Sequence, residues 1–186
     1  TPVRRMIGHQ HRVNLIRFHP HAKDIIVSAS PELGEPTVRY WNIATGKEVL
    51  KIAAGFEEMV FDLAHSFDGS LVAIVSKDRK LRIIDARSGK VVQEGPSHEG
   101  VRGARVAWLG NTGRIVTVGA DKSSQREIRV YDASNLAQGV LSTTPLDISP
   151  GVLVPHYDEG TKVLFVWGRV RALALALLTV LLRRSS

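Results

Sequence analysis

Two pairs of histidines are the residues whose spacing most suggests metal chemistry. His9 and His11, and His19 and His21, are each separated by one residue. Alternate side chains on a strand point the same way, and imidazole is a common zinc ligand. No third ligand lies nearby, and the chain has no cysteine. His9 follows Gly8 at the start of a repeat, and His19-Pro-His21 is expected in a turn, so we predict no metal site and a structural hydrogen bond for His9.

Other motifs of catalysis are absent from the chain. It contains no Gly-x-Ser-x-Gly elbow, no Gly-x-x-x-x-Gly-Lys-Ser/Thr loop and no Gly-x-Gly-x-x-Gly turn. Adjacent carboxylates occur at Glu57-Glu58 and at Asp158-Glu159, both in expected loops or strand edges, where solvated surface residues are common. We predict that the protein is not an enzyme and needs no cofactor.

A basic turn is the strongest candidate for partner binding. Lys77, Arg79 and Lys80 surround Asp78 between two expected strands, and Arg12 and Arg102 lie in loops expected at the same end. Such tips could form one basic patch for an acidic protein surface. The competing interpretation is a solvated hairpin whose turn is ordered by Asp78.

Composition and charge describe a globular chain that is only mildly basic in its main part. Its 186 residues are 44% hydrophobic and 23% charged, and the net charge is +7. Arg169, Arg171, Arg183 and Arg184 supply +4, which leaves +3 for residues 1–168. We therefore do not expect a nucleic-acid partner. The absence of cysteine is compatible with the cytoplasm.

The last residues differ from the rest, and we treat 169–186 as a divergent apolar and basic tail. The 11 uncharged residues from Ala172 to Leu182 fall short of the roughly 20 that a spanning helix needs, and no secretory leader is recognisable at the start. Three interpretations of the tail remain: a terminus from alternative splicing or a shifted gene model, which we favour, a short membrane-surface helix, or a replacement strand.

The elements that must position these residues come from an internal repeat. The phrases Thr37–Lys47, Lys80–Lys90 and Glu127–Leu136 each place an aromatic or aliphatic residue before an amide or acid. These pairs are Trp41-Asn42, Ile84-Asp85 and Tyr131-Asp132, at intervals of 43 and 47 residues. Four-stranded blades of WD-type propellers repeat at about 40 to 45 residues, with Gly-His near the start and Trp-Asp near the end.

Apolar runs between turn signals predict the strands of each unit. They are expected at 13–18, 25–28, 37–41 and 48–52, at 59–64, 71–76, 80–84 and 91–93, at 104–109, 114–118 and 127–132, and at 151–155 and 162–167. The pattern then stops, with no third strand expected in the fourth unit. The fold class is all-β: a partial WD40-type propeller of about three and a half blades over residues 1–168, with apolar faces uncovered.

The repeated phrase has a structural explanation. We expect Trp41, Ile84 and Tyr131 to pack a strand against the neighbouring blade. The following Asn or Asp should cap the next turn, with Gly46 and Gly89 allowing the reversal. Asp85 and Asp132 are therefore interpreted as structural and not catalytic.

Three stretches resemble the coronins, actin-associated propeller proteins. They are Ser76–Asp85, His98–Arg105 continuing to Ser124–Asp132, and Gly151–Thr161. Three further segments are most similar in sequence to the second propeller of the tandem, POD-type coronins. They are Gln93–Pro96, Arg102–Arg105 and Asn135–Gly139. The resemblance covers residues 7–168. It does not include the family's first blades, its closing blades or its C-terminal extension.

The resemblance implies a non-catalytic interaction module that binds actin filaments or cytoskeletal and trafficking partners. It implies a cytoplasmic, cytoskeletal and, for the tandem type, Golgi-associated protein. The alternative is a general WD-repeat scaffold in vesicle or ubiquitin-ligase assemblies without actin contact. The chain is expected to need other blades or a partner chain to complete the propeller, and its tail could make weak membrane-surface contact.

Overall fold

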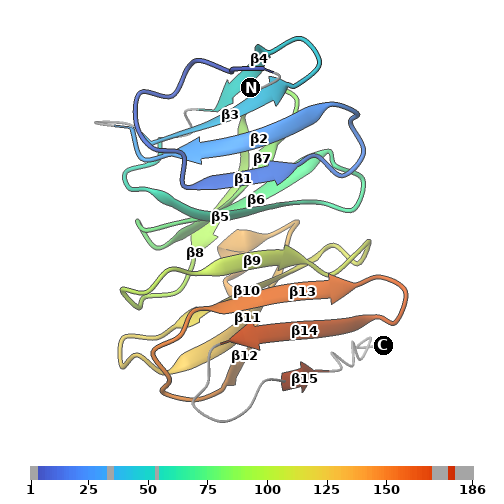
Figure 1. Cartoon of the computed structure of the whole chain (residues 1–186). Coiled ribbons are helices and arrows are strands. Elements are labelled where there is room, and N and C mark those ends of the chain that lie inside the picture. Colours follow the sequence, from blue (N-terminus) through green and yellow to red (C-terminus); the bar gives the residue numbers. More distant parts are fainter. Residues whose placement is uncertain (1–3, 33–35, 53–54, 169–175, 179–186) are drawn as a thin grey trace.

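The computed structural model describes residues 4–32, 36–52 and 55–168 and the backbone of 176–178, and the described part is almost entirely β-structure. Three antiparallel sheets have four strands each, in sequence order, and a fourth sheet has three. We call these sheets blades 1 to 4 (Figure 1). A 3-10 turn, η1 (Leu136–Gln138), is the one helical element in the described residues.

The strands follow one another within each blade. Blade 1 contains β1 (Leu15–Phe18), β2 (Ile25–Ser30), β3 (Thr37–Asn42) and β4 (Lys47–Ile52). Blade 2 contains β5 (Val60–His65), β6 (Leu71–Ser76), β7 (Lys80–Asp85) and β8 (Val91–Pro96). Blade 3 contains β9 (Arg105–Trp108), β10 (Arg114–Ala120), β11 (Arg126–Asp132) and β12 (Val140–Pro145). Blade 4 contains β13 (Leu153–Asp158), β14 (Val163–Gly168) and β15 (Ala176–Leu178).

The predicted fold class is confirmed, and the strand predictions need two corrections. β12 completes blade 3, although no fourth strand was expected there. β15 pairs antiparallel with β14, so the expectation that blade 4 has no third strand was wrong. This pairing gives the backbone of 176–178 the place of a replacement strand; the rest of the tail lies outside the described residues.

The blades stack face to face, and each junction contains its own apolar cluster. β2 of blade 1 packs with β6 of blade 2 through Val27 and Ile74, among others. Blade 2 packs on blade 3 through residues such as Val75 and Ile115, and blade 3 on blade 4 through residues such as Val116 and Leu164. Alternate residues of a strand face opposite sides, so each inner blade buries both of its faces.

The residues that define the repeat occupy equivalent places, as expected. Trp41, Ile84 and Tyr131 each lie in the third strand of their blade. A register shift towards the fourth strand begins at each of them. Ile84 and Tyr131 belong to clusters shared with the preceding blade. The repeat therefore encodes a repeated backbone irregularity as well as repeated strands.

The amide or acid that follows caps the next turn in all three blades. The Asn42 side chain accepts the Thr45 amide at 2.9 Å, Asp85 accepts that of Ser88 at 2.7 Å, and Asp132 accepts that of Ser134 at 2.9 Å. Gly46 and Gly89 then adopt φ of 75° and 71°, where a side chain is strained. The predicted turn caps are confirmed in all three blades. Packing against a neighbouring blade is confirmed for Ile84 and Tyr131, whereas Trp41 belongs to none of the clusters between the described blades.

The first strands of the blades line the inside of the arc that the four sheets form. Figure 1 shows β1, β5, β9 and β13 one after another down the middle of the molecule. Blades 1 and 4 lie at the two ends of this arc. A loop joins each sheet to the next, and all of these loops lie at the same end of the strands. They therefore lie on one surface of the molecule.

Candidate interaction face

The loops at one end of the strands form what we call the loop face. It consists of the loops that precede β1, β5 and β9 and the β2–β3, β6–β7 and β10–β11 turns. Backbone hydrogen bonds connect these segments: the Lys77 amide donates to Met59 at 2.9 Å, and the Ser97 amide donates to Arg79 at 2.8 Å. The five predicted binding residues, Arg12, Lys77, Arg79, Lys80 and Arg102, all lie in or next to these segments.

Two of the predicted basic residues are partly neutralised. The Lys77 ammonium lies 3.1 Å from Glu58, and that of Lys80 lies 3.5 Å from Glu57 and 3.3 Å from Glu94. The hydrogen bond between Lys80 and Glu94 raises the pKa of Lys80. The centre of the loop face is therefore of mixed charge, because the acids at Glu57 and Glu58 fold against the basic turn.

The other three predicted residues are arginines, and they differ in how exposed their side chains are. Arg12 and Arg79 are exposed, and neither side chain forms an ion pair with any described residue. Arg79 has a φ of 65°, the left-handed conformation of a tight turn. Arg102 is half-buried and donates from Nη1 to the Ser149 carbonyl at 3.0 Å, which ties two loops together. Arg12 and Arg79 are thus the cations that remain available on this face.

Asp78 orders the basic turn from within. Its Oδ1 accepts the Ser76 hydroxyl at 2.6 Å and the Lys80 amide at 3.1 Å, and its Oδ2 pairs with Arg82 at 2.7 Å. Burial opposes ionisation, but these hydrogen bonds hold the pKa of Asp78 below its usual value. The turn that presents Arg79 is rigidly held.

Behind the loops, blade 1 contains a chain of hydrogen bonds that begins at Trp41. The indole N–H donates to the Ser28 hydroxyl at 2.8 Å, and that hydroxyl lies 2.7 Å from Nε2 of His9. Nδ1 of His9 lies 2.9 Å from Glu32. These partners assign the imidazole proton to Nδ1, with Nε2 accepting from Ser28. His9 therefore makes the kind of hydrogen bond within the blade that we expected.

Blade 3 has a similar array around a more deeply buried histidine. Nε2 of His98 lies 2.8 Å from the Thr117 hydroxyl, and Nδ1 lies 3.0 Å from Glu127, which Arg129 contacts at 2.7 Å. Burial, with a contribution from the Arg129 charge, lowers the pKa of His98 to about 4. Burial also raises the pKa of Glu127. His98 is neutral at physiological pH.

Blade 2 lacks the histidine, and its arginine is more deeply buried than the equivalent arginines of blades 1 and 3. Arg82 is buried, and its guanidinium bonds Ser76 at 2.9 Å, Asp78 at 2.7 Å and Glu94 at 2.8 Å. It also lies 5.3 Å from the centre of the Phe56 ring, within the range of a cation–π contact. Strand register places Ile74 opposite Arg82, where Thr117 and Ser28 face the arginines of blades 3 and 1.

Sequence reasoning missed the acids and the arginine of these arrays. Glu32 and Glu127 were not identified as partners of histidines, and Arg82 was taken as an ordinary strand residue. One signal was available: an arginine occurs two residues before the aromatic or aliphatic position in each repeat, at Arg39, Arg82 and Arg129. Their acidic partners come from different places in each blade, so the spacing alone could not identify them.

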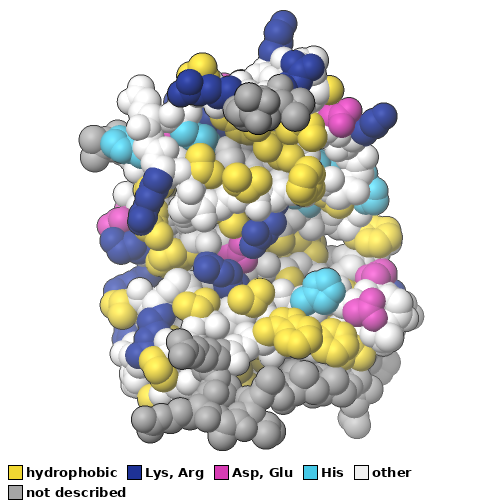
Figure 2. All heavy atoms as spheres, in the orientation of Figure 1, with side chains coloured by type: hydrophobic (Ala, Val, Ile, Leu, Met, Phe, Trp, Pro, Cys, Tyr) yellow, Lys and Arg dark blue, Asp and Glu magenta, His cyan; other side chains and the backbone are white. Residues whose placement is uncertain are grey.

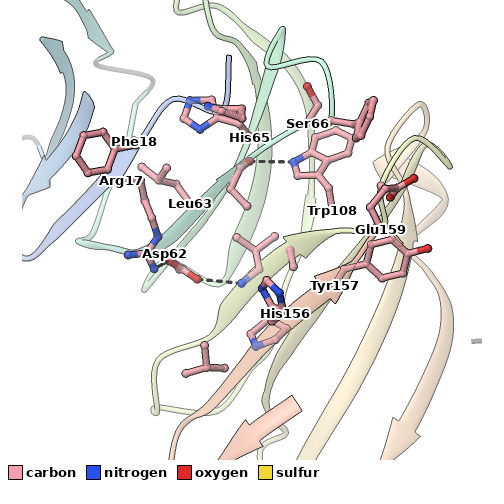
Figure 3. Close-up of a pocket in the computed structure, with 18 of the residues that line it drawn as sticks. Arg17, Phe18, Asp62, Leu63, His65, Ser66, Trp108, His156, Tyr157 and Glu159 are labelled. Carbon is pink, nitrogen blue, oxygen red and sulfur yellow. Dashed lines mark hydrogen bonds and ion pairs between the residues drawn. The ribbon is translucent and has the colours of Figure 1, made fainter. Parts of the chain in front are cut away.

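A cavity of about 470 Å³ opens on the inside of the arc (Figure 3). The first strands of all four blades contribute to it, with Phe18 on one side and Tyr157 on the other. Arg17 pairs with the buried Asp62 at 2.9 Å, and the Trp108 indole donates to the Ala64 carbonyl at 2.9 Å. Burial raises the pKa of Asp62.

Two polar side chains that are adjacent in sequence at this cavity, His65 and Ser66, make structural contacts. Nε2 of His65 lies 2.8 Å from the Tyr40 hydroxyl, and the Ser66 hydroxyl donates to Asp68 at 2.6 Å. His65 and Ser66 therefore do not form a nucleophile–base pair, although they are adjacent in sequence. Burial lowers the pKa of His65 to about 4, with a contribution from His19.

Two searches of the described residues bear on other kinds of site. Within the described ranges, no group of three or more His, Cys, Asp or Glu side chains is arranged to hold a metal ion. Among the same residues, no helix has the length and apolar character needed to cross a membrane.

Comparisons with known proteins agree with this architecture. Residues 47–85 match the family described as "WD domain, G-beta repeat". The crystal structure of the WD40 domain from Toxoplasma gondii coronin superposes with a TM-score of 0.79 and 25% identity. That superposition covers 90% of this chain and 43% of the other. The fold is a WD40-type β-propeller, of which the described residues form three four-stranded blades and a three-stranded fourth.

The relatives identify the particular family. A coronin-like protein of Saccharomyces cerevisiae is 40% identical over 90% of this chain, and mouse Coronin-7 is 39% identical over 91% of it. The chain belongs to the coronin family. It spans 25% of the yeast relative and 18% of the mouse one. These near-equal identities do not separate the tandem type from other coronins, so that finer assignment stays a prediction.

Proposed function

We propose that this chain is a non-catalytic interaction module that binds actin filaments through the loop face. The observation that carries the proposal is the pair Arg12 and Arg79, two exposed cations without an ion pair to any described residue. The Ser30 hydroxyl donates to the Arg12 carbonyl at 3.1 Å, and Asp78 accepts the Lys80 amide at 3.1 Å in the turn that carries Arg79. Unpaired cations on rigid loops attract an acidic protein surface and lose little conformational entropy when they bind it.

Membership of the coronin family supports actin as the partner, because the resemblance that the sequence shows is to actin-associated proteins. It also supports a place in the cytoplasm with the cytoskeleton. Golgi association is proposed from the tandem-type resemblance.

The non-catalytic part of the proposal is supported by three histidines that already have structural partners. His9, His65 and His98 each contact structural partners within or between blades. The pKa values of His65 and His98, both about 4, make them poor general bases near neutral pH.

A general WD-repeat scaffold is the second candidate function. It is favoured by the ion pairs of Lys77 and Lys80 with Glu57, Glu58 and Glu94, which make the centre of the loop face mixed in charge. Surfaces of mixed charge suit an adaptor protein with matching charges as well as a filament. Vesicle or ubiquitin-ligase assemblies without actin contact belong to this class.

Cosedimentation with actin filaments tests the proposal. The purified chain should pellet with filaments at low ionic strength, and less of it should pellet as salt is raised, because exposed charge pairs are screened. A chain that stays in the supernatant at every salt concentration, while the same preparation captures other proteins from a lysate, would remove actin and favour the general scaffold.

A further inference from the structure

Two aliphatic side chains are exposed among the loops of blades 3 and 4, and we call them the aliphatic pair. Val101 is 83% exposed and Ile148 is 75% exposed. Val101 lies in the loop before β9, which belongs to the loop face, and Ile148 lies in the loop between β12 and β13. In Figure 2, which has the orientation of Figure 1, the loop face is the left edge of the molecule, where hydrophobic side chains lie among those of Lys and Arg.

A hydrogen bond joins the two loops that carry the aliphatic pair. Nη1 of Arg102 donates to the carbonyl of Ser149 at 3.0 Å, and these two residues directly follow the two aliphatic ones. The loop before β9 is also bonded to the basic turn, because the Ser97 amide donates to the Arg79 carbonyl at 2.8 Å. The aliphatic pair is therefore continuous with the part of the loop face that presents Arg79.

The backbone is anchored on both sides of each aliphatic residue. Before the valine, the Gly100 amide donates to the Ala120 carbonyl at 2.8 Å. Before the isoleucine, the Asp147 carbonyl accepts the Arg126 amide at 2.7 Å. The hydrogen bond between the two loops holds the residue that follows each of them. Side chains on a backbone that is already ordered lose little conformational entropy when a partner binds them.

The acidic groups next to the aliphatic pair are neutralised within the chain. The Asp147 carboxylate pairs with the buried guanidinium of Arg126, and this hydrogen bonding holds the pKa of Asp147 below its usual value. The Glu99 carboxylate lies 3.3 Å from the ammonium of Lys122. The half-buried Arg102 leaves the surroundings mildly basic. An acidic partner therefore meets no uncompensated carboxylate here, and the aliphatic side chains are the main contact that this region offers.

We propose that the aliphatic pair makes the apolar, salt-insensitive part of the contact between this chain and actin filaments. The inference rests on the proposed function and adds the chemistry of a second contact to it. The partner surface should carry apolar side chains beside the acidic groups that meet Arg12 and Arg79. Single exposed aliphatic residues are common on protein surfaces, but these two lie on loops bonded to each other and to the basic turn. An apolar centre with a polar rim is the usual composition of a protein interface.

Cosedimentation at a series of salt concentrations separates the apolar contact from the ionic one. The double variant Val101→Ser, Ile148→Ser should bind filaments about 10- to 100-fold more weakly than the native chain. The factor should be the same at every salt concentration, because the removal of apolar surface from water is not screened by ions. The binding that remains, through the arginines, should keep the salt dependence of the native chain.

Two control variants show whether the loss comes from apolar contact at this place. Val49→Ser, Val92→Ser removes two aliphatic side chains that are 60% and 53% exposed on β4 and β8, the last strands of blades 1 and 2. Val101→Ile, Ile148→Val keeps the apolar character of the pair. Both controls should bind filaments like the native chain. Circular dichroism of each variant should show the β-sheet spectrum of the native chain.

The outcomes that overturn this inference differ from those that overturn the proposed function. If the native chain pellets with filaments and the serine variant of the aliphatic pair pellets equally, the inference fails and the proposed function remains. An equal loss in either control would also refute the inference, because the effect would then not be specific to apolar contact by the pair. If the serine variant converts a native dimer to a monomer with filament binding unchanged, the pair contacts a second copy and the inference fails. A native chain that never pellets overturns the proposed function and this inference together.

Discussion

Blades 1 and 3 stabilise their centres differently from blade 2. The first two use a buried histidine between a hydroxyl and a glutamate, at His9 and His98. Blade 2 has Phe56 near its centre and a buried guanidinium, Arg82, with two acidic partners. The backbone repeat is the same in all three, so the polar centre of a blade can change while the register and the turns are kept.

This difference predicts that mutations at the centres of the blades reduce stability by unequal amounts. Removing the histidine of blade 1 or blade 3 costs one hydrogen bond to a hydroxyl and one to a glutamate. A buried guanidinium leaves uncompensated charges when it is removed, and such charges are costly in a protein interior. Blade 2 should therefore be the most sensitive to a change at its centre.

Arg82→Met should have the largest effect. It leaves Asp78 buried without its cation and Glu94 without one of its two partners, so the free energy of unfolding should fall by about 3 to 5 kcal/mol. Urea denaturation of the variant measures this loss. Arg114→Met, in a half-buried position at the start of β10, is the control and should change stability little. Equal losses in both variants would remove the special role of Arg82.

His98→Phe should have the next largest effect, because it gives blade 3 an aromatic residue in the manner of Phe56 in blade 2. Thr117 and the buried Glu127 lose a partner, and the expected cost is about 1 to 3 kcal/mol. The same denaturation measurement applies. A neutral or stabilising result would mean that the two kinds of blade centre are interchangeable.

Acid should weaken the fold through the buried histidines. The folded chain holds His65 and His98 neutral down to a pKa of about 4, whereas the unfolded chain takes up these protons near 6.5. The unfolded state thus binds more protons between these values, so stability should fall as pH decreases from about 6.5 to about 4. Melting temperatures across this range measure the slope, which should be shallower in His98→Phe.

Trp41→Phe should have the smallest effect of the four. It keeps the aromatic packing and removes only the N–H that donates to Ser28, for a loss of about 1 kcal/mol. Trp167→Phe is the matched control, since that indole is half exposed on blade 4. A larger loss at Trp167 than at Trp41 would contradict the array in blade 1.

The sequence alone predicted the repeat and most strands. Each repeated segment combines apolar residues of period two with a capped turn, and both are visible in the sequence. β12 was missed because Val140–Pro145 is a largely exposed outer strand without an apolar pattern. A third strand in blade 4 was only one of three interpretations of the tail, because the alternation of Ala and Leu there carries no turn signal. Local patterns are strongest where a strand is buried on both sides.

The candidate face was less predictable. The sequence located Arg12, Lys77, Arg79, Lys80 and Arg102 in loops at one end, and the structure places them there. It did not indicate that Glu57 and Glu58 pair with Lys80 and Lys77, since these contacts depend on how the loop before β5 folds against the β6–β7 turn. The burial of Arg82 likewise depends on Phe56, which is 26 residues away in the chain.

The most direct test of the account is filament cosedimentation of the double variant Arg12→Glu, Arg79→Asp. Asp suits the left-handed conformation at position 79, so the turn should persist. Arg87→Asp, an exposed cation on the β7–β8 turn at the opposite end of the strands, is the control. The account predicts that the control pellets like the native chain while the double variant stays in the supernatant at low salt. Equal pelleting of all three would contradict binding through the loop face.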